Sequence, residues 1–429
     1  MKQSDIPQFG LLNGLNVVYS GSTIAAPFGP ALMADMGANV IWIEHYLNQD
    51  VQRTGTSYGY EAELDRRNQR TISLNVPSEK GKEIFLKLVA EADIFIEGSR
   101  GGQWDKWGLT DEYIWEQSNP KLVIAHVSGY GQTGLSEYVK RGSYDPTAQA
   151  FGGLMYVNQD SSGKYLPVGG TVADYYTGYM AAVACLAAYI KAQQTGEGES
   201  IDVAQYEAVV RSLNHMDMDI WNMNMTLEDF NDPDRNSGTA GYNSFVCKDG
   251  EQIYMLALGA GNMRRLAELL EVGPDIIPEG VGLLFIDGRE PDGHKMEECI
   301  KQFCSERTAA EVEEEMASKG IPCTRIMSYE AMLNHPHYLA RETLTTWETK
   351  EGTNVIGPNI LPKLKKNPGQ IWRGCPARGA DNDDILEELG YSPDEITRFY
   401  ADKVITQFDN DPVIVRKEWN GTIINPEGV

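Results

Sequence analysis

The residue most suited to chemistry in this chain is an acid, Asp174, which follows a glycine pair and precedes a long apolar segment. Gly169 and Gly170 permit a tight backbone turn and leave space beside the acid. Residues 179–190 are small or apolar and contain no Pro or Gly, which predicts a buried helix. We therefore expect Asp174 at or just before a helix start, where unpaired N–H groups and the helix dipole favour a carboxylate. Two interpretations stay open: an N-cap aspartate, or a carboxylate nucleophile that faces a cleft.

The composition limits the classes of ligand that this acid can act on. The chain has 429 residues, enough for two domains and a large core, and 41% of them are hydrophobic. Asp and Glu number 62 against 37 Lys and Arg, a net charge of −25. Such an excess argues against general binding to nucleic acid or to an anionic membrane. A site for a phosphorylated ligand must therefore gather its few cations locally.

Cysteine usage and hydropathy indicate the cellular compartment of the protein. The six cysteines are scattered without a Cys-x-x-Cys pair, which predicts free thiols in a reducing cytoplasm and no metal site. The N-terminal residues contain no apolar signal core, and no uncharged apolar run reaches about 18 residues. We expect a cytoplasmic protein without a membrane span.

Strand and helix patterns alternate over roughly the first 200 residues, as in α/β proteins. The expected strands are 15–19, 38–44, 70–75, 93–97 and 122–126, with helices over 24–37 and 78–92. This rhythm predicts a Rossmann-like, doubly wound sheet with right-handed crossovers. Ligands of such sheets bind beyond the carboxyl ends of strands, where Ser22, Thr23, residues 98–100 and residues 128–131 fall.

A nicotinamide site is disfavoured despite the βαβ pattern. Glu44 lies about where a ribose-binding acid would be expected. However, the first turn lacks the Gly-x-Gly-x-x-Gly spacing, and Pro27 and Pro30 occupy the first helical turns.

The composition changes after the element that runs from Ser200 to Leu213. We expect 1–213 to form the first part of the large domain and 214–236, rich in Met, Trp, Asn and Asp, to form a linker. Residues 237–330 then read as a small α+β domain with a hairpin at Asp249–Gly250. Residues 331–429 are expected to form an extended, Pro-rich arm that returns to the large domain.

Common catalytic templates are absent from the sequence. There is no Gly-x-Ser-x-Gly, Walker or His-Glu-x-x-His motif, and the six histidines are isolated. His126 and His215 are interpreted as hydrogen-bonded polar groups rather than bases. What remains is Asp174, together with Arg100 and Lys106 on a glycine-rich loop. This set suits covalent carboxylate chemistry on an anionic ligand.

A series of short motifs carries a family resemblance. They are residues 14–15 with 24–27, 37–44, 67–70, 92–97, 128–131, 143–145 with 148–150, 173–174 and 195–200. In this order and spacing the chain resembles the class III CoA-transferases over nearly its whole length. Residues 172–175 and 357–374 resemble the carnitine/crotonobetaine CoA-transferases. Residues 101–105, 203–208 and 407–409 resemble the bile-acid CoA-transferases.

The resemblance implies a Rossmann-like large domain, a small domain, and two subunits threaded through each other as an interlocked homodimer. It places the family nucleophile on Asp174. This carboxylate would attack the donor acyl-CoA to give a mixed anhydride and free CoA. CoA would then attack the aspartyl carbonyl to give an aspartyl-CoA thioester. The acceptor carboxylate would attack that thioester and displace CoA. CoA would then attack the acceptor carbonyl, so that the new acyl-CoA leaves and Asp174 is regenerated, with water kept out.

The resemblance also assigns binding residues. Expected contacts to CoA, the substrate carrier, are Ser22, Thr23, Ile24, His45, Leu74, Asn75, Gly98, Ser99, Arg100 and, in place of a basic residue expected at Trp107, Lys106. Tyr144 and Asp145 match positions that line the site near the nucleophile. Expected oxyanion donors are the peptide N–H groups of Gly169 and Gly170, or of the loop with Gly238 and Gly241. No metal is implied.

Two other functions remain as alternatives. One is an acyl-CoA racemase or epimerase of the same fold, which needs a His/Asp proton-transfer pair near the thioester. The other is a non-catalytic CoA-binding protein. The acceptor is also open: a cationic acid such as carnitine would use Trp221 or Asp217, whereas a steroid acid would use the Met-rich segment.

Overall fold

The computed structural model describes residues 1–54, 60–160, 162–213, 216–226, 239–272, 286–288 and 290–407. The chain divides into two compact units, one of residues 1–213 and 340–429 and the other of residues 214–339. The second boundary therefore falls after Leu339, whereas the sequence analysis placed it at 330/331.

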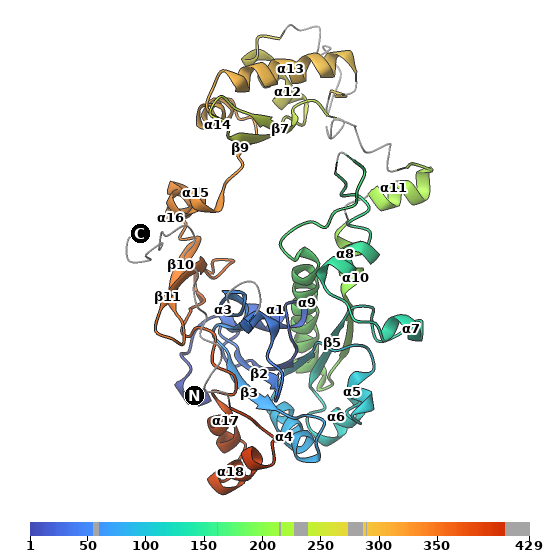
Figure 1. Ribbon diagram of the computed structural model, residues 1–429, viewed down its shortest axis with the longest axis vertical. Coiled ribbons are helices and arrows are strands. Elements are labelled where there is room, and N and C mark those ends of the chain that lie inside the picture. The colour runs from blue at the N-terminus through green and yellow to red at the C-terminus, as the bar shows by residue number, and fades with distance from the viewer. Residues whose placement is uncertain are drawn as a thin grey trace. The chain divides into compact units, whose positions relative to one another are not determined.

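The first unit is built on a six-stranded sheet with the order β3-β2-β1-β4-β5-β6 (Figure 1). The strands are β1 (Asn16–Ser20), β2 (Asn39–His45), β3 (Arg70–Leu74), β4 (Ile94–Glu97), β5 (Val123–Ser128) and β6 (Ser200–Ala204). All neighbours pair in parallel. The predicted α/β class with a parallel sheet is confirmed. Strand order reverses between β1 and β4, so a crevice opens at their carboxyl ends.

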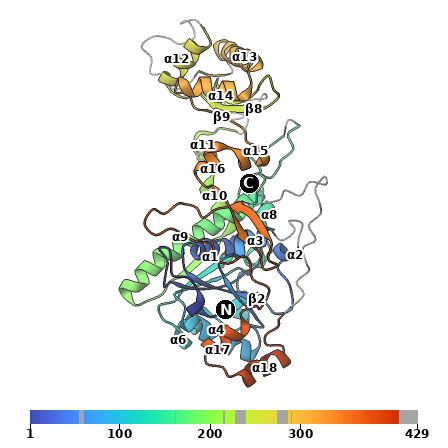
Figure 2. The same cartoon turned by 90° about the vertical axis from the view of Figure 1, so that its left-hand side faces the viewer.

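Helices cover both faces of this sheet. Helices α1 (Ala25–Asp35) and α9 (Val172–Thr195) pack on one face and lie side by side in Figures 1 and 2. The other face is covered by α4 (Glu79–Ala90), α5 (Gln103–Lys106), α6 (Asp111–Gln117), α17 (Asn382–Glu388) and α18 (Pro393–Ala401). The shorter helices of the unit are a 3-10 turn (Gln3–Asp5), α2 (Val51–Thr54), α3 (Tyr60–Arg66), α7 (Ser136–Val139), α8 (Asp145–Phe151) and α10 (Gln205–Ser212).

Helix α9 begins earlier than the apolar pattern predicts. It starts at Val172 and ends at Thr195, where Gly196 adopts a left-handed φ of 81°. Asp174 therefore lies inside the first turn, and Thr171 takes the N-cap position without a side-chain cap. Across the described parts of the chain, no helix is both long and apolar enough to cross a membrane.

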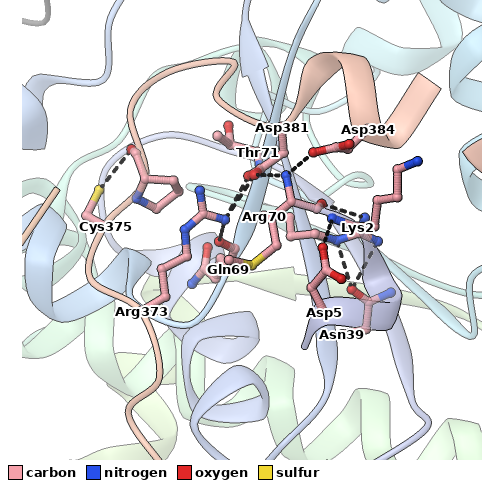
Figure 3. A network of polar contacts seen from close by, with 12 residues as sticks. Lys2, Asp5, Asn39, Gln69, Arg70, Thr71, Arg373, Cys375, Asp381 and Asp384 are labelled. Atoms are coloured by element: carbon pink, nitrogen blue, oxygen red, sulfur yellow. Dashed lines mark hydrogen bonds and ion pairs between the residues drawn. The ribbon is translucent and has the colours of Figure 1, made fainter. Parts of the chain in front are cut away.

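The C-terminal segment of this unit returns to the sheet and forms hydrogen bonds with residues at and just before the start of β3. Strands β10 (Leu344–Glu348) and β11 (Asn354–Pro358) form an antiparallel ribbon. Arg67 Nη1 donates to the Pro358 carbonyl at 2.8 Å, and Asn68 Oδ1 accepts from the N–H of Trp372 at 2.8 Å. Asp381 then accepts from the Thr71 N–H at 2.9 Å and from Arg373 (Figure 3). These bonds tie the arm to β3.

The second unit is a small α+β body. Its sheet has the order β7-β8-β9, all antiparallel, with β7 (Tyr242–Val246), β8 (Gln252–Leu256) and β9 (Cys323–Arg325). Its helices are α11 (Met216–Met223), α12 (Ala260–Leu269), α13 (Pro291–Ser305), α14 (Ala309–Ser318), α15 (Tyr329–Asn334) and α16 (Pro336–Ala340), the last of which crosses the boundary. Part of the expected linker 214–236 is therefore helical. Asp217 and Asp219 in the first turn of α11 suit its N-terminus.

The crossing of α1 and α9 requires a glycine. A Cβ added to Gly178 would lie 2.8 Å from the Phe28 Cβ and 3.1 Å from the Ala25 carbonyl oxygen. The two helices approach closely here because Gly178 has no side chain.

We expect Gly178→Ala to lower the free energy of unfolding by about 1–3 kcal/mol in urea titrations, because the added methyl group forces α1 and α9 apart. Gly261→Ala is the control. It also places a methyl group in a helix, but the nearest atom is the flexible Arg265 end at 3.8 Å. That variant should be neutral or stabilising. An equal loss in both would contradict the packing argument.

Candidate functional site

Two cavities lie at the carboxyl edge of the parallel sheet and share the residues Ser22, Gly98 and Ser99. The first has a volume of about 380 Å³ and contains Asp174. The second has a volume of about 550 Å³ and lies beside the ends of β2 and β3. The shared residues belong to the turns after β1 and β4, where the strand order reverses. The cavities therefore occupy the position at which open α/β sheets bind ligands.

Asp174 is a buried side chain at the wall of the first cavity, with 7% of its surface exposed. Its Oδ1 accepts a hydrogen bond from Gln205 Nε2, at the first residue of α10. The Gln205 Oε1 in turn accepts from Ser143 Oγ at 2.8 Å. Because an ionised carboxylate can only accept hydrogen bonds, the amide nitrogen faces Asp174 and the amide oxygen faces the Ser143 hydroxyl. The carboxylate is thus held in one orientation.

Asp145 caps the helix that carries Asp174. Its Oδ1 accepts the N–H of Ala173 at 2.7 Å and lies 3.4 Å from the N–H of Asp174. Asp145 is 4% exposed and does not line either cavity. The sequence analysis placed Asp145 beside the ligand and considered Asp174 as an N-cap. Instead, Asp145, which begins α8, caps the start of α9, and the side chain of Asp174 lines the cavity.

Burial and three nearby acids change the ionisation of Asp174. Burial, followed by the negative charges of Asp145, Asp65 and Glu61, raises the pKa of Asp174 to about 7. The sequence analysis expected the helix start to favour the ionised form of this group. In the structure, loss of hydration and repulsion between carboxylates oppose the helix dipole. Near neutral pH both forms are populated, which is typical of functional groups.

Most of the residues predicted to bind CoA lie at these cavities. Ser22, Thr23, Arg100 and Tyr144 line the first cavity, and His45, Leu74 and Asn75 line the second. Gly98 and Ser99 line both. The ends of the strands predicted Ser22, Thr23 and residues 98–100, whereas the family resemblance predicted His45, Leu74, Asn75 and Tyr144.

Several predicted residues lie elsewhere. Ile24 is buried at the N-cap of α1, and Lys106 is an exposed side chain at the end of α5, while Trp107 lines the second cavity. Gly169 and Gly170 are exposed and line neither cavity. Their loop is held against α8 because Gln149 exchanges two hydrogen bonds with Val168, at 2.8 and 2.9 Å.

The expected glycine loop is only partly visible. Gly238 lies outside the described residues. Gly241 belongs to the second unit, where its N–H donates to Glu297 Oε1 at 2.8 Å. A Cβ on Gly241 would lie within 3.5 Å of Ala257, Leu266 and Ile300. This glycine therefore serves the packing of its own unit, and its N–H is not available to an oxyanion.

The structure adds residues that the sequence analysis missed. Gln205 is the first of them; its only signal was its place directly after a strand end, at the junction of β6 and α10. The second is Arg141, which lines the first cavity with Arg100. Its guanidinium lies 3.9 Å from the centroid of the Tyr138 ring. Gly142 leaves space for the other guanidinium, since an added Cβ would lie 3.4 Å from Arg100 Nη2. Two cations thus flank one cavity of an acidic protein.

His126 is confirmed as a hydrogen-bonded polar group. Its Nδ1 lies 2.9 Å from Glu97 Oε1, and its Nε2 lies 3.0 Å from Asp111 Oδ1. Burial opposes its charge, but the bonds to these two carboxylates prevail and raise the pKa of His126 to about 10. His126 lines neither cavity, and no histidine lines the first cavity among the described residues. An imidazole base is therefore absent from that part of the Asp174 environment which the structure describes.

Comparisons with known proteins agree on one family. The model of CoA-transferase family III matches residues 12–382 of this chain. A crystal structure of a CAIB/BAIF family protein from Brucella suis is 24% identical, has a TM-score of 0.73, and covers 89% of this chain and 100% of its own. The Mycobacterium tuberculosis protein Rv3272, in an orthorhombic form, is 18% identical with a TM-score of 0.76, and the match covers 89% of this chain and 100% of that one. At these identities the likeness to the solved structures concerns the fold.

The raised pKa of Asp174 predicts a pH-dependent cost in stability. The folded value of about 7 exceeds the ordinary value of 3.8, so ionisation disfavours the folded state increasingly as pH rises from 3.8 to 7. Asp174→Asn removes this charge. We expect the variant to match the wild type near pH 4 and to exceed it by up to roughly 4 kcal/mol above pH 7, in urea unfolding. A difference that does not change with pH would refute the assigned shift.

Proposed function

Because this chain belongs to CoA-transferase family III, we propose that it moves CoA from an acyl-CoA donor to a carboxylic acid acceptor through Asp174. The observation that carries this proposal is the position of Asp174: a buried, oriented carboxylate on the wall of a cavity at the carboxyl edge of the sheet. A sealed carboxylate would have excluded covalent chemistry. An exposed one would lack the protection from water that an anhydride needs.

The two adjoining cavities suit a long ligand. CoA has a nucleotide end and a thiol end joined by a pantetheine chain. The second cavity offers flat aromatic and apolar side chains for the nucleotide, including Trp42, Tyr46 and Leu74. The thiol end is proposed to pass the shared residues Ser22 and Ser99 and reach Asp174 in the first cavity. Arg100 and Arg141 are proposed to bind its phosphates or the acid substrates.

The chain's own groups support the proposed steps as follows. In its ionised form, Asp174 attacks the thioester carbonyl, and its elevated pKa favours nucleophilic strength once the proton has left. Gln205 Nε2 holds one oxygen, which leaves the other to form the new bond. The same amide can later donate to the carbonyl oxygen of an aspartyl anhydride or thioester. Ser143 keeps this donor in place.

The alternative function is an acyl-CoA racemase of the same fold. Proton abstraction beside a thioester carbonyl needs a base and an acid on two sides of the carbon atom. Asp174 supplies one such group. The histidine expected as its partner is not among the described residues that line the first cavity, where Tyr144 and Ser143 lie instead.

The acceptor acid is proposed to be of the carnitine or the bile-acid type. The motifs at 172–175 and 367–373 support the first class, and those at 101–105 and 203–208 support the second. Both classes of CoA thioester therefore enter the experiment.

We expect Asp174→Ala to reduce CoA transfer at least about a thousandfold, because no other residue is proposed to carry the acyl group. Purified protein is incubated with carnitine-type and bile-acid CoA thioesters and hydroxylamine. Mass spectrometry of peptides should then show a hydroxamate on Asp174, and calorimetry should show that the variant still binds CoA. Asp105→Ala, an exposed acid outside both cavities, is the control. Wild-type protein that exchanges α-deuterium without transferring CoA would establish the racemase instead.

We also propose that the protein is a homodimer. Helix α9 has no charged side chain from Tyr175 to Ile190, and one face of it is exposed in a single chain. On that face Tyr179, Val183 and Ile190 are 53%, 70% and 60% exposed. Their spacing of four and seven residues forms one stripe. Apolar stripes of this kind mark surfaces that another molecule covers.

The dimer proposal has a direct test. Val183→Asp should convert the protein from dimer to monomer in size-exclusion chromatography with light scattering, because it places a charge in the apolar stripe. Tyr113→Asp is the control, an exposed apolar residue on α6 at 41% exposure. A wild-type protein that is monomeric at all concentrations would overturn the proposal.

A further inference from the structure

The turn between β1 and α1 contains a strained residue. Thr23 has a φ of 62°, in the left-handed region that branched side chains rarely adopt. It lines the cavity of Asp174, and its neighbour Ser22 lines both cavities. Such a conformation persists only where surrounding contacts impose it.

Two buried side chains hold both peptide groups of Thr23. Its N–H donates to Asp50 Oδ2 at 3.0 Å, and its carbonyl accepts from Arg66 Nη2 at 2.7 Å. Asp50 and Arg66 also bind each other, with Oδ2 and Nη2 separated by 3.1 Å. The three groups thus form a closed ring of hydrogen bonds, in which the ion pair binds both the N–H and the carbonyl of the strained residue.

The same cluster also holds Gly21, which lies two residues before Thr23 in the turn. The Arg66 guanidinium lies 4.5 Å from the Trp42 ring centroid, and Trp42 Nε1 donates to the Gly21 carbonyl at 3.0 Å. The side chain of Arg66 is fully buried and lines neither cavity, and that of Asp50 is 2% exposed, at the wall of the second cavity. Burying an ion pair is expensive and rarely justified by stability alone. Here it determines the geometry of residues 21–23.

We propose that Asp50 and Arg66 are positioning residues for this site: by holding Thr23 in its left-handed conformation, they place the turn that lines both cavities against the CoA thioester. This inference rests on the proposed function for the identity of the ligand. The coupling between the ion pair and the turn is independent of the proposed function.

The chain supplies a matched control pair. Asp35 and Arg67 form a second buried ion pair, with Oδ2 and Nη2 in contact and side-chain exposures of 13% and 3%. Asp35 also accepts from Asn68 Nδ2 at 2.8 Å. None of these three side chains lines either cavity. Removing one charge from either pair should cost stability, but only the first pair should affect the ligand.

The test compares Asp50→Asn with Asp35→Asn. Both oxygens of Asp50 accept backbone N–H groups, the second from Gln52 at 2.9 Å, so an amide must turn its NH₂ toward a donor. By calorimetry, we expect Asp50→Asn to weaken CoA binding at least about tenfold. Asp35→Asn should change it less than about twofold, although both variants melt at a lower temperature. Arg66→Lys keeps the charge but loses the planar pair of N–H donors, and it should weaken CoA binding as Asp50→Asn does. Arg66 lines neither cavity, so this variant separates positioning of the turn from a direct contact of Asp50 with the ligand.

A rescue experiment separates positioning from general stability. Glycine adopts positive φ without strain, so Thr23→Gly should restore part of the CoA affinity of Asp50→Asn and raise its melting temperature. It should not rescue Asp35→Asn. Strict additivity of Thr23→Gly with Asp50→Asn would overturn the inference, as would normal CoA affinity in Asp50→Asn.

Failure of the proposed function gives a different result. If wild-type protein does not bind CoA, the proposed function is wrong. The melting temperatures then test whether the ion pair holds the conformation of Thr23. A larger gain from Thr23→Gly in Asp50→Asn than in the wild type would then still support the coupling. Equal gains would reject it.

Discussion

The hydrogen bond from the Ala173 N–H to the Asp145 carboxylate is the interaction on which this site depends. Helix α9 begins after a residue that offers no side-chain cap, so its first N–H groups need an acceptor from elsewhere. Asp145 provides it, and thereby brings a second carboxylate beside Asp174. The same contact satisfies the start of the helix that carries Asp174. After burial, which is the largest cause, the charge of Asp145 also raises the pKa of Asp174.

Helix α1 is anchored in a similar way. Both helices follow a threonine with positive φ, Thr23 before α1 and Thr171 before α9, with φ of 62° and 51°. In each case a buried aspartate from another segment accepts a backbone N–H near the turn, Asp50 in the first and Asp145 in the second. Both helices pack on the same sheet face and cross closely. The cavity between their first turns is thus defined by contacts between residues distant in sequence.

The dependence of the site on contacts between distant residues explains which of its features could be predicted from the sequence and which could not. Alternating strand and helix patterns predicted the parallel sheet, and strand ends located Ser22, Thr23 and Gly98, because these follow from local periodicity. Asn75 was reached only through the family resemblance. Gly169 was assigned to the site by its nearness to Asp174 in sequence, yet its loop is drawn to α8 by Gln149. Gln205 carried no motif of its own. Side-chain direction depends on tertiary partners, which a single sequence does not display.

The raised pKa of Asp174, which follows from these partners, suits its proposed role in catalysis. A carboxylate at its ordinary pKa is a weak nucleophile and an easily displaced leaving group. A group with a pKa of about 7 keeps a large ionised fraction near neutrality and bonds more firmly to carbon once acylated. The same burial that raises the pKa also limits access of water to the acylated side chain. The loss of stability from placing two acids together is therefore the expected counterpart of a carboxylate suited to covalent transfer.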